Sequence, residues 1–144
     1  MDTLTATSSV HVDVEPSAVW TGITDPATNS EIYFGARVDT DWREGSPITF
    51  TGDWKGTSYV DKGEILRVEP ERLLQFTYWS SMGGSNDEPD NYATITFRLA
   101  PRDGGTELTV TQDKLADEEG RAQAESNWRQ MLDNVKQVIE KRHG

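Results

Sequence analysis

The sequence contains no cysteine, so disulfides, thiolate metal ligands and cysteine nucleophiles are excluded. Basic residues are scarce, since 14 Lys and Arg stand against 25 Asp and Glu, which gives a formal net charge of -11. Binding to nucleic acid or to anionic lipid needs clustered Lys and Arg. The charge balance therefore predicts no nucleic acid and no membrane as partners, and the scattered acids are equally consistent with a role in solubility alone.

Long apolar runs are also missing. Residues Met1 to Ser9 hold no basic residue and no apolar run, which is unlike a signal peptide or a membrane anchor, so we expect a cytoplasmic protein. The length of 144 residues fits a single domain over 1–144 with one core. Hydrophobic residues make up only 34%, but five Trp, four Tyr and four Phe concentrate them in large rings, which can fill a core or line a cavity.

Sequence motifs of known catalytic sites are lacking. The two histidines are His11, in a strand pattern and facing away from the valines, and His143, near the end of a helix pattern. A catalytic histidine needs an orienting partner in a cleft, and neither position suggests one. The segment 39–45 has some likeness to a calcium loop, but Arg43 stands at a ligand position. We therefore predict no catalytic residue, no metal site and no cofactor.

The clearest pattern that is present is a long amphipathic helix from about Asp117 to Arg142. Its apolar residues recur at spacings of three and four, which places them on one face: Trp128, Met131, Leu132, Val135, Val138 and Ile139. The opposite face is polar, and Glu125 with Arg129 is predicted to form an i,i+4 ion pair. Asp117 is predicted to cap the first turn. The apolar face must be buried, and a sheet is its natural partner.

Period-two alternation predicts about seven strands before this helix, the first around Val10, Val12 and Val14. Two short helices are expected next, one starting at Pro16 and one from Pro26 to about Tyr33. The remaining strands are expected at 36–42, 48–54, 59–68, 73–79, 93–99 and 108–110. Their connections are short, so the strands must be antiparallel.

Glycines and polar residues indicate interruptions between these strands. Gly52 and Gly56 divide what would otherwise be one long strand, and we expect a bulge or loop that carries Trp54. Residues 80–91 combine glycines with acids and have almost no apolar anchor, so this segment is predicted to be a loop.

Several short segments have a characteristic order and spacing: Pro16 with Val19-Trp20, Thr24-Asp25-Pro26, Gly63-Glu64-Ile65, Val68-Glu69-Pro70, Leu74 with Phe76-Thr77, Gly105-Thr106 with Leu108 to Thr111, and Trp128 with Leu132 and Val135. Together they resemble the START and Bet v 1-like (SRPBCC) superfamily, in particular the group similar to the activator of the heat-shock protein 90 ATPase. The likeness spans about Val10 to Ile139. The chain departs from it at Gln112 and Asn127, where relatives often carry His and Gly.

The resemblance implies an α+β helix-grip fold, in which a curved antiparallel sheet wraps around the long C-terminal helix. In families of this fold the space between helix and sheet is commonly a ligand cavity. The residues expected to face such a cavity are Val38, Phe50, Ile65, Phe76, Tyr78, Ile95, Phe97, Trp128, Met131 and Leu132. The alternative is that these side chains pack on one another and form a filled core.

The leading functional hypothesis is a non-catalytic small-molecule binding domain that holds an apolar or amphipathic ligand, as a monomer or weak dimer. The resemblance implies a first alternative, a co-chaperone or another module that binds a protein partner. A second alternative is a cyclase-like enzyme, for which Tyr78 and Arg67 are the nearest polar candidates. Buried ionisable pairs would favour the enzyme, an exposed apolar patch the partner module, and an enclosed apolar cavity the binding domain.

Overall fold

The computed structural model describes residues 4–25, 31, 36–80 and 86–143. Its elements are β1 (Leu4–Val12), α1 (Pro16–Thr24), β2 (Arg37–Asp39), β3 (Pro47–Trp54), β4 (Thr57–Glu69), β5 (Leu73–Tyr78), the 3-10 helix η1 (Pro89–Asn91), β6 (Ala93–Arg102), β7 (Gly105–Leu115) and α3 (Glu118–His143). The second short helix, expected from Pro26 to about Tyr33, lies outside the described residues, apart from Glu31. So does the stretch 81–85 of the expected loop.

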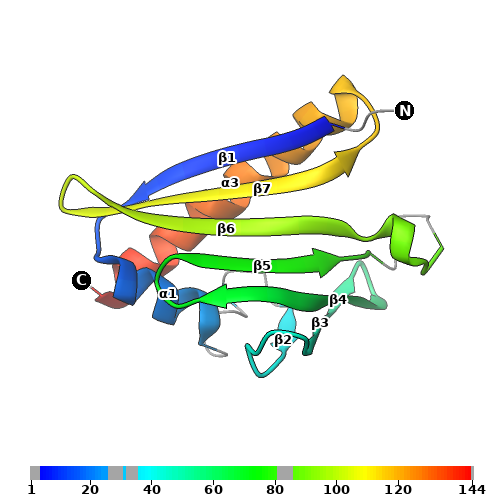
Figure 1. Ribbon diagram of the computed structural model, residues 1–144, viewed down its shortest axis with the longest axis horizontal. Helices are drawn as coiled ribbons and strands as arrows, with labels where there is room; N and C mark the ends of the chain where they lie inside the picture. Colours follow the sequence, from blue (N-terminus) through cyan, green and yellow to red (C-terminus); the bar gives the residue numbers. More distant parts are fainter. Residues whose placement is uncertain (1–3, 26–30, 32–35, 81–85, 144) are drawn as a thin grey trace.

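The seven strands form one antiparallel sheet in the order β1-β7-β6-β5-β4-β3-β2. Strands β2 to β7 therefore follow one another as a meander, as their short connections require, and β1 joins the free edge of β7. Helix α3 crosses one face of this sheet and packs most closely on β1 and β7 (Figure 1). This arrangement confirms the helix-grip prediction.

The β3–β4 connection differs from the expected bulge or loop. Gly52 lies within β3 opposite Tyr59, and Trp54 is the last residue of the strand, so that expectation is wrong. Lys55 and Gly56 form a two-residue turn in which both have positive φ, 50° and 82°. Such turns match the twist of the strands that they join. A Cβ on Gly52 would lie 2.6 Å from the Tyr59 hydroxyl, so the tyrosine ring already fills the space above the glycine.

Strand β4 departs from regular geometry where it pairs with β5. A Cβ on Gly63 would lie only 1.6 Å from the carbonyl oxygen of Thr77, so only glycine allows the two backbones to approach this closely. Further along, Ile65 pairs with Phe76 whereas Arg67 pairs with Gln75, which leaves one extra residue in β4. This β-bulge shifts the alternation by one position. Ile65 is fully buried, and Arg67 is exposed on the opposite face.

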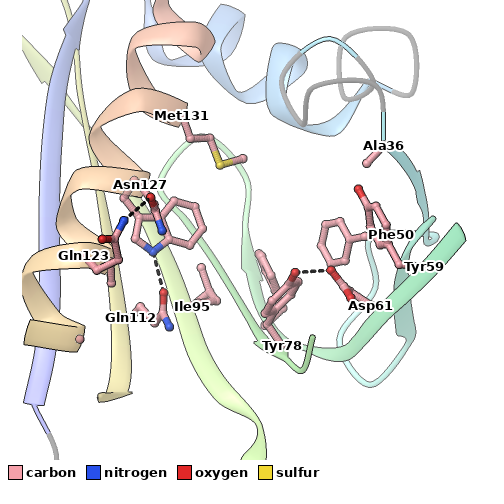
Figure 2. A pocket seen from close by; sticks show the side chains of 14 residues that line it. Ala36, Phe50, Tyr59, Asp61, Tyr78, Ile95, Gln112, Gln123, Asn127 and Met131 are labelled. Carbon is pink, nitrogen blue, oxygen red and sulfur yellow. Dashed lines mark hydrogen bonds between the residues drawn. The ribbon is translucent and has the colours of Figure 1, made fainter. Parts of the chain in front are cut away.

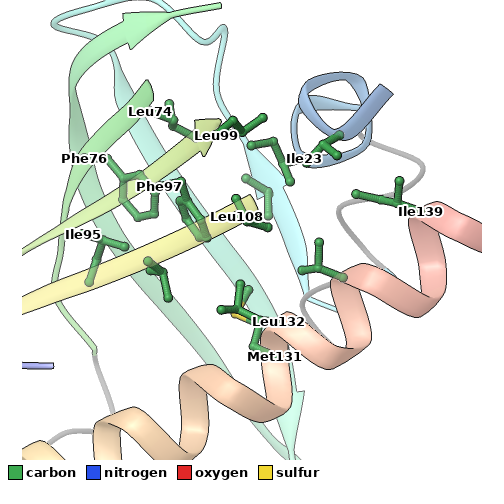
Figure 3. Close-up of a cluster of buried hydrophobic side chains, with 14 of the residues drawn as sticks. Ile23, Leu74, Phe76, Ile95, Phe97, Leu99, Leu108, Met131, Leu132 and Ile139 are labelled. Atoms are coloured by element: carbon green, nitrogen blue, oxygen red, sulfur yellow. The ribbon is translucent and has the colours of Figure 1, made fainter. Parts of the chain in front are cut away.

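The apolar face of α3 is buried, as the helical spacing predicts. Met131, Leu132, Val135 and Ile139 are buried against the sheet, and Trp128 and Val138 are partly buried beside them. Figure 3 shows the helix side chains facing Phe97, Leu108 and their neighbours on the strands.

The polar contacts of α3 follow the sequence prediction in part. Asp117 caps the helix, because its Oδ1 accepts a hydrogen bond from the Gly120 amide at 2.8 Å. Glu125 pairs at 3.0 Å with Arg121, which lies one turn before it, whereas the pattern suggested Arg129, one turn after it. Within the described ranges, no helix is long and apolar enough to cross a membrane.

Candidate functional site: a cavity between helix and sheet

A cavity of about 480 Å³ lies between α3 and the sheet. Figure 2 shows residues of α3 on one side, residues of β3 and β4 on the other, and Ile95 and Tyr78 between them. The described residues that line it are Ala36, Phe50, Tyr59, Asp61, Phe76, Tyr78, Ile95, Gln112, Gly120, Gln123, Ala124, Asn127, Trp128 and Met131. Helix α3 packs most closely on β1 and β7, and the cavity adjoins buried residues of β3 and β5 such as Phe50 and Phe76.

The strand register explains why these side chains share one face. Phe50 pairs with Asp61 across β3 and β4, and Phe76 pairs with Ile95 across β5 and β6. Ile95 in turn pairs with Gln112 of β7. Directly opposed residues of neighbouring strands point to the same side of a sheet. The cavity wall is therefore built from residues that lie far apart in the chain.

The aromatic rings of this wall form a connected series together with Phe97, which belongs to the core cluster. The Phe50 ring lies 6.0 Å from that of Phe76 and 5.4 Å from that of Tyr78, the second contact being edge-to-face. Phe76 lies 6.1 Å from Phe97, and Phe97 contacts Trp128 edge-to-face at 5.9 Å. These centroid distances lie in the range of favourable aromatic pairs, roughly 4.5–7 Å. The rings hold one another in place from β3 to α3.

A polar pair lies among these rings. The Tyr78 hydroxyl donates a hydrogen bond to Oδ2 of Asp61, whose residue exposure is only 6%. Burial, together with this hydrogen bond, raises the pKa of Tyr78, so its hydroxyl keeps its proton at neutral pH. Burial and the nearby Asp61 and Asp53 carboxylates also raise the pKa of Tyr59. Among the described residues that line the cavity, Asp61 alone carries a formal charge.

A second polar contact joins the helix to the last strand. Nε1 of Trp128 donates a hydrogen bond to Oε1 of Gln112 at 2.7 Å. Gln112 lies within β7, which extends to Leu115 and not only to about Val110 as the alternation suggested. On the exposed side of α3, Gln123 donates to Asn127 at 3.1 Å, and both side chains reach the edge of the cavity. Two positions where the chain departs from its resembled family, Gln112 and Asn127, thus lie at the cavity.

The ten residues expected to face a cavity divide into two groups. Six of them line it: Phe50, Phe76, Tyr78, Ile95, Trp128 and Met131. The other four are buried in the adjoining core cluster: Val38, Ile65, Phe97 and Leu132. The expected residues are therefore divided between those that border the cavity and those that only pack in the core.

The polar candidates differ more from the sequence-based expectation. Arg67 pairs with Glu69 on the outer face and has no access to the cavity, so it is excluded as a partner of Tyr78. Asp61 and Tyr59 were not recognised as lining residues. They lie an even number of residues before Ile65, and residues at i, i+2 and i+4 of a strand share a face. This spacing could have predicted that both side chains lie on the same face as Ile65.

Neither histidine is among the described residues that line the cavity. Nε2 of His11 lies 2.9 Å from the Arg102 carbonyl oxygen, and its Nδ1 lies 3.2 Å from Asp13. His143 is the last residue of α3, and its side chain is outside the described part. In the described part of the chain, no three His, Asp or Glu side chains come together in a group that could hold a metal ion.

A curved antiparallel sheet that grips a long C-terminal helix, with a cavity between the two, defines a helix-grip domain of the START and Bet v 1-like superfamily. The family model described as "Activator of Hsp90 ATPase homolog 1-like protein" matches residues 13–140. This match covers most of the chain, and the protein belongs to that family.

Solved structures agree with this assignment. The solution structure of ChR145 from Cytophaga hutchinsonii is 34% identical, with a TM-score of 0.85, over 99% of this chain and 98% of that chain. The Aha1 dimer from Colwellia psychrerythraea is 12% identical, with a TM-score of 0.74, over 95% and 96%. CalU16 from Micromonospora echinospora is 19% identical, with a TM-score of 0.70, over 99% and 87%. The last two show likeness of fold alone. No curated protein gave a match.

Proposed function

We propose that this protein is a non-catalytic binding domain that holds an apolar or amphipathic small molecule between α3 and the sheet. The observation that carries this proposal is the cavity of about 480 Å³, which is lined by the rings of Phe50, Phe76, Tyr78 and Trp128. Its volume falls within the roughly 300–1,000 Å³ of small-molecule sites, which are lined mainly by apolar side chains with a few convergent polar groups. The Asp61–Tyr78 and Trp128–Gln112 contacts supply such polar groups.

The Asp61–Tyr78 pair is also the feature that a cyclase-like enzyme would need, so this alternative has some support. A general acid or base works best when its pKa lies near the operating pH. Burial moves the pKa of the Tyr78 hydroxyl further from neutrality, which makes it a poor proton donor or acceptor. Arg67, the other candidate, lies on the outer face. Tyr78 is therefore better suited to bind a polar group than to transfer a proton.

The family description suggests the other alternative, a partner-binding or co-chaperone module. Among the described residues, the exposed large hydrophobics are Val60 and Leu66, at 49% and 37%. Scattered exposed apolar residues are normal on a soluble protein, whereas docking surfaces are usually larger contiguous patches. The cavity supports small-molecule binding more strongly than this surface supports protein binding.

A ligand screen tests the proposal. A molecule that binds only the folded state stabilises it by about 2.7 kcal/mol at a hundredfold excess over its dissociation constant. Aromatic and amphipathic compounds should raise the melting temperature and shift the NMR signals of Phe76, Ile95 and Trp128. Nucleotides should have no such effect.

Two matched variants of α3 locate the binding. Ala124 lines the cavity, whereas Ala122 is exposed on the same helix. Ala124→Leu places added volume in the cavity and should abolish the ligand-induced shift, and Ala122→Leu should leave it unchanged. The proposal fails if no compound of the screen binds, or if ligands stabilise the Ala124→Leu variant as well as the original protein.

A further inference from the structure

The charge on the cavity wall restricts the class of ligand. We propose that the cavity selects aromatic ligands that carry an ammonium group, with Asp61 as the residue that binds this group. This inference rests on the proposed binding function and makes it more specific. Three observations carry it: the sign of the charge, the accepting capacity of the carboxylate, and the rings beside it.

The first observation is the absence of basic residues from the described lining, in which Asp61 alone is charged. The cations of β4 are paired elsewhere. Lys62 lies 2.5 Å from the Asp87 carboxylate, and Arg67 contacts Glu69 on the outer face. An anionic ligand such as a fatty acid would therefore place its negative charge near a buried carboxylate. The described wall holds no cation to compensate this repulsion, and the repulsion is strong away from water. A cationic ligand gains from the same carboxylate.

The second observation is the geometry of the Asp61 carboxylate. It is almost completely removed from solvent, and it belongs to the cavity wall. Tyr78 donates to one of its oxygens, and a carboxylate offers about four acceptor sites in all. The ammonium group of a ligand would add to the hydrogen bonds that this carboxylate already accepts.

The third observation is the aromatic surroundings. Phe50 lies directly opposite Asp61 across β3 and β4, and the Phe50 ring contacts that of Tyr78 at 5.4 Å. Tyr59 lines the cavity two residues before Asp61 on the same face of β4. Ring faces attract cations, and they also stack on the apolar part of an aromatic ligand. A carboxylate beside such rings provides both halves of a site for an aromatic ammonium compound.

Three probes of nearly equal shape separate charge from apolar contact: 2-naphthylmethylamine, 2-naphthylmethanol and 2-naphthoate. Isothermal titration calorimetry at pH 7 should give at least about tenfold tighter binding of the amine than of the alcohol, since a charge-assisted hydrogen bond is worth about 1.4 kcal/mol or more. The naphthoate should bind most weakly. Asp61→Asn should bring the amine and the alcohol to nearly equal affinity while changing the alcohol little.

The control is Asp53→Asn, which removes the same charge from an exposed residue of the neighbouring strand β3. It should leave the preference for the amine unchanged, so a general effect of net charge is separated from a local one. Tyr78→Phe provides a second variant if Asp61→Asn does not fold. It retains the carboxylate and should keep the preference for the amine. A loss of preference in that variant would show that the hydroxyl selects the ligand.

Other results overturn the inference in distinguishable ways. If the alcohol or the naphthoate binds at least as tightly as the amine, or if Asp61→Asn leaves the ratio unchanged, the ammonium preference is refuted and the binding function stands. If none of the three probes binds while other members of the screen do, the proposed ligand class is also refuted. If nothing binds at all, both proposals fall together.

Discussion

Replacing Trp128 by alanine should lower the free energy of unfolding by about 2.5–3.5 kcal/mol, near the lower limit of the about 3–5 kcal/mol that a fully packed Trp contributes. The ring is only partly buried, because one side of it borders the cavity. Its hydrogen bond to Gln112 contributes about 1 kcal/mol, and its edge-to-face contact with Phe97 about 0.5–1.5 kcal/mol. Apolar burial on the core side adds about 1 kcal/mol.

Two further variants separate these contributions. Trp128→Phe retains an aromatic ring and removes the Nε1 donor, so it should cost about 1 kcal/mol. Gln112 is half-buried, and its freed carbonyl can turn to water, which keeps this cost low. Arg129, the next residue, is exposed, so Arg129→Ala should change the stability by no more than about 0.5 kcal/mol.

Urea denaturation followed by far-UV circular dichroism measures these differences, since that signal does not depend on the removed indole. The slope of the free energy against urea should stay the same in all variants. A loss below about 1 kcal/mol for Trp128→Ala would show that the ring does not pack on the sheet. A loss above about 4 kcal/mol would show a ring enclosed on both sides, with no cavity beside it.

Three further predictions concern the backbone and one ion pair. Gly63→Ala should cost about 3 kcal/mol or more in urea denaturation, because its Cβ would overlap a backbone oxygen; a cost under about 1 kcal/mol would contradict the close approach. Lys55→Asn should raise the melting temperature slightly, since Asn-Gly suits the turn formed with Gly56; a decrease would refute the turn assignment. The Lys136 ammonium lies 2.7 Å from the Glu140 carboxylate and lowers the pKa of Glu140. The ion pair therefore stabilises the folded state fully above about pH 4.3, the ordinary pKa of Glu. This stabilisation is lost as the pH falls through the lowered pKa of the folded state. Glu140→Gln should flatten this acid dependence, and an unchanged pH profile would exclude the effect.

The sequence by itself determined the elements and their directions. Strands repeat every two residues and helices about every 3.6, and both periods depend only on local backbone geometry. The alternation around Phe76 and Ile95 therefore predicted strands, and the spacing from Trp128 to Ile139 predicted a helix. Short connections then required antiparallel neighbours. The buried face of α3 and the cap at Asp117 were predicted for the same reason, since each depends on residues within one turn of the helix.

Only the tertiary structure decided which side chains of the strands and of α3 come together. The β-bulge beyond Ile65 turns Arg67 outward, and no local pattern marks it, because it arises from the pairing of β4 with β5. The same pairing brings Tyr78 to Asp61, which makes a polar site from two residues that are unremarkable in sequence. Whether an apolar residue fills a core or lines a cavity depends on where α3 lies over the sheet. Leu132 and Phe50 both belong to the buried core cluster, but only Phe50 also lines the cavity.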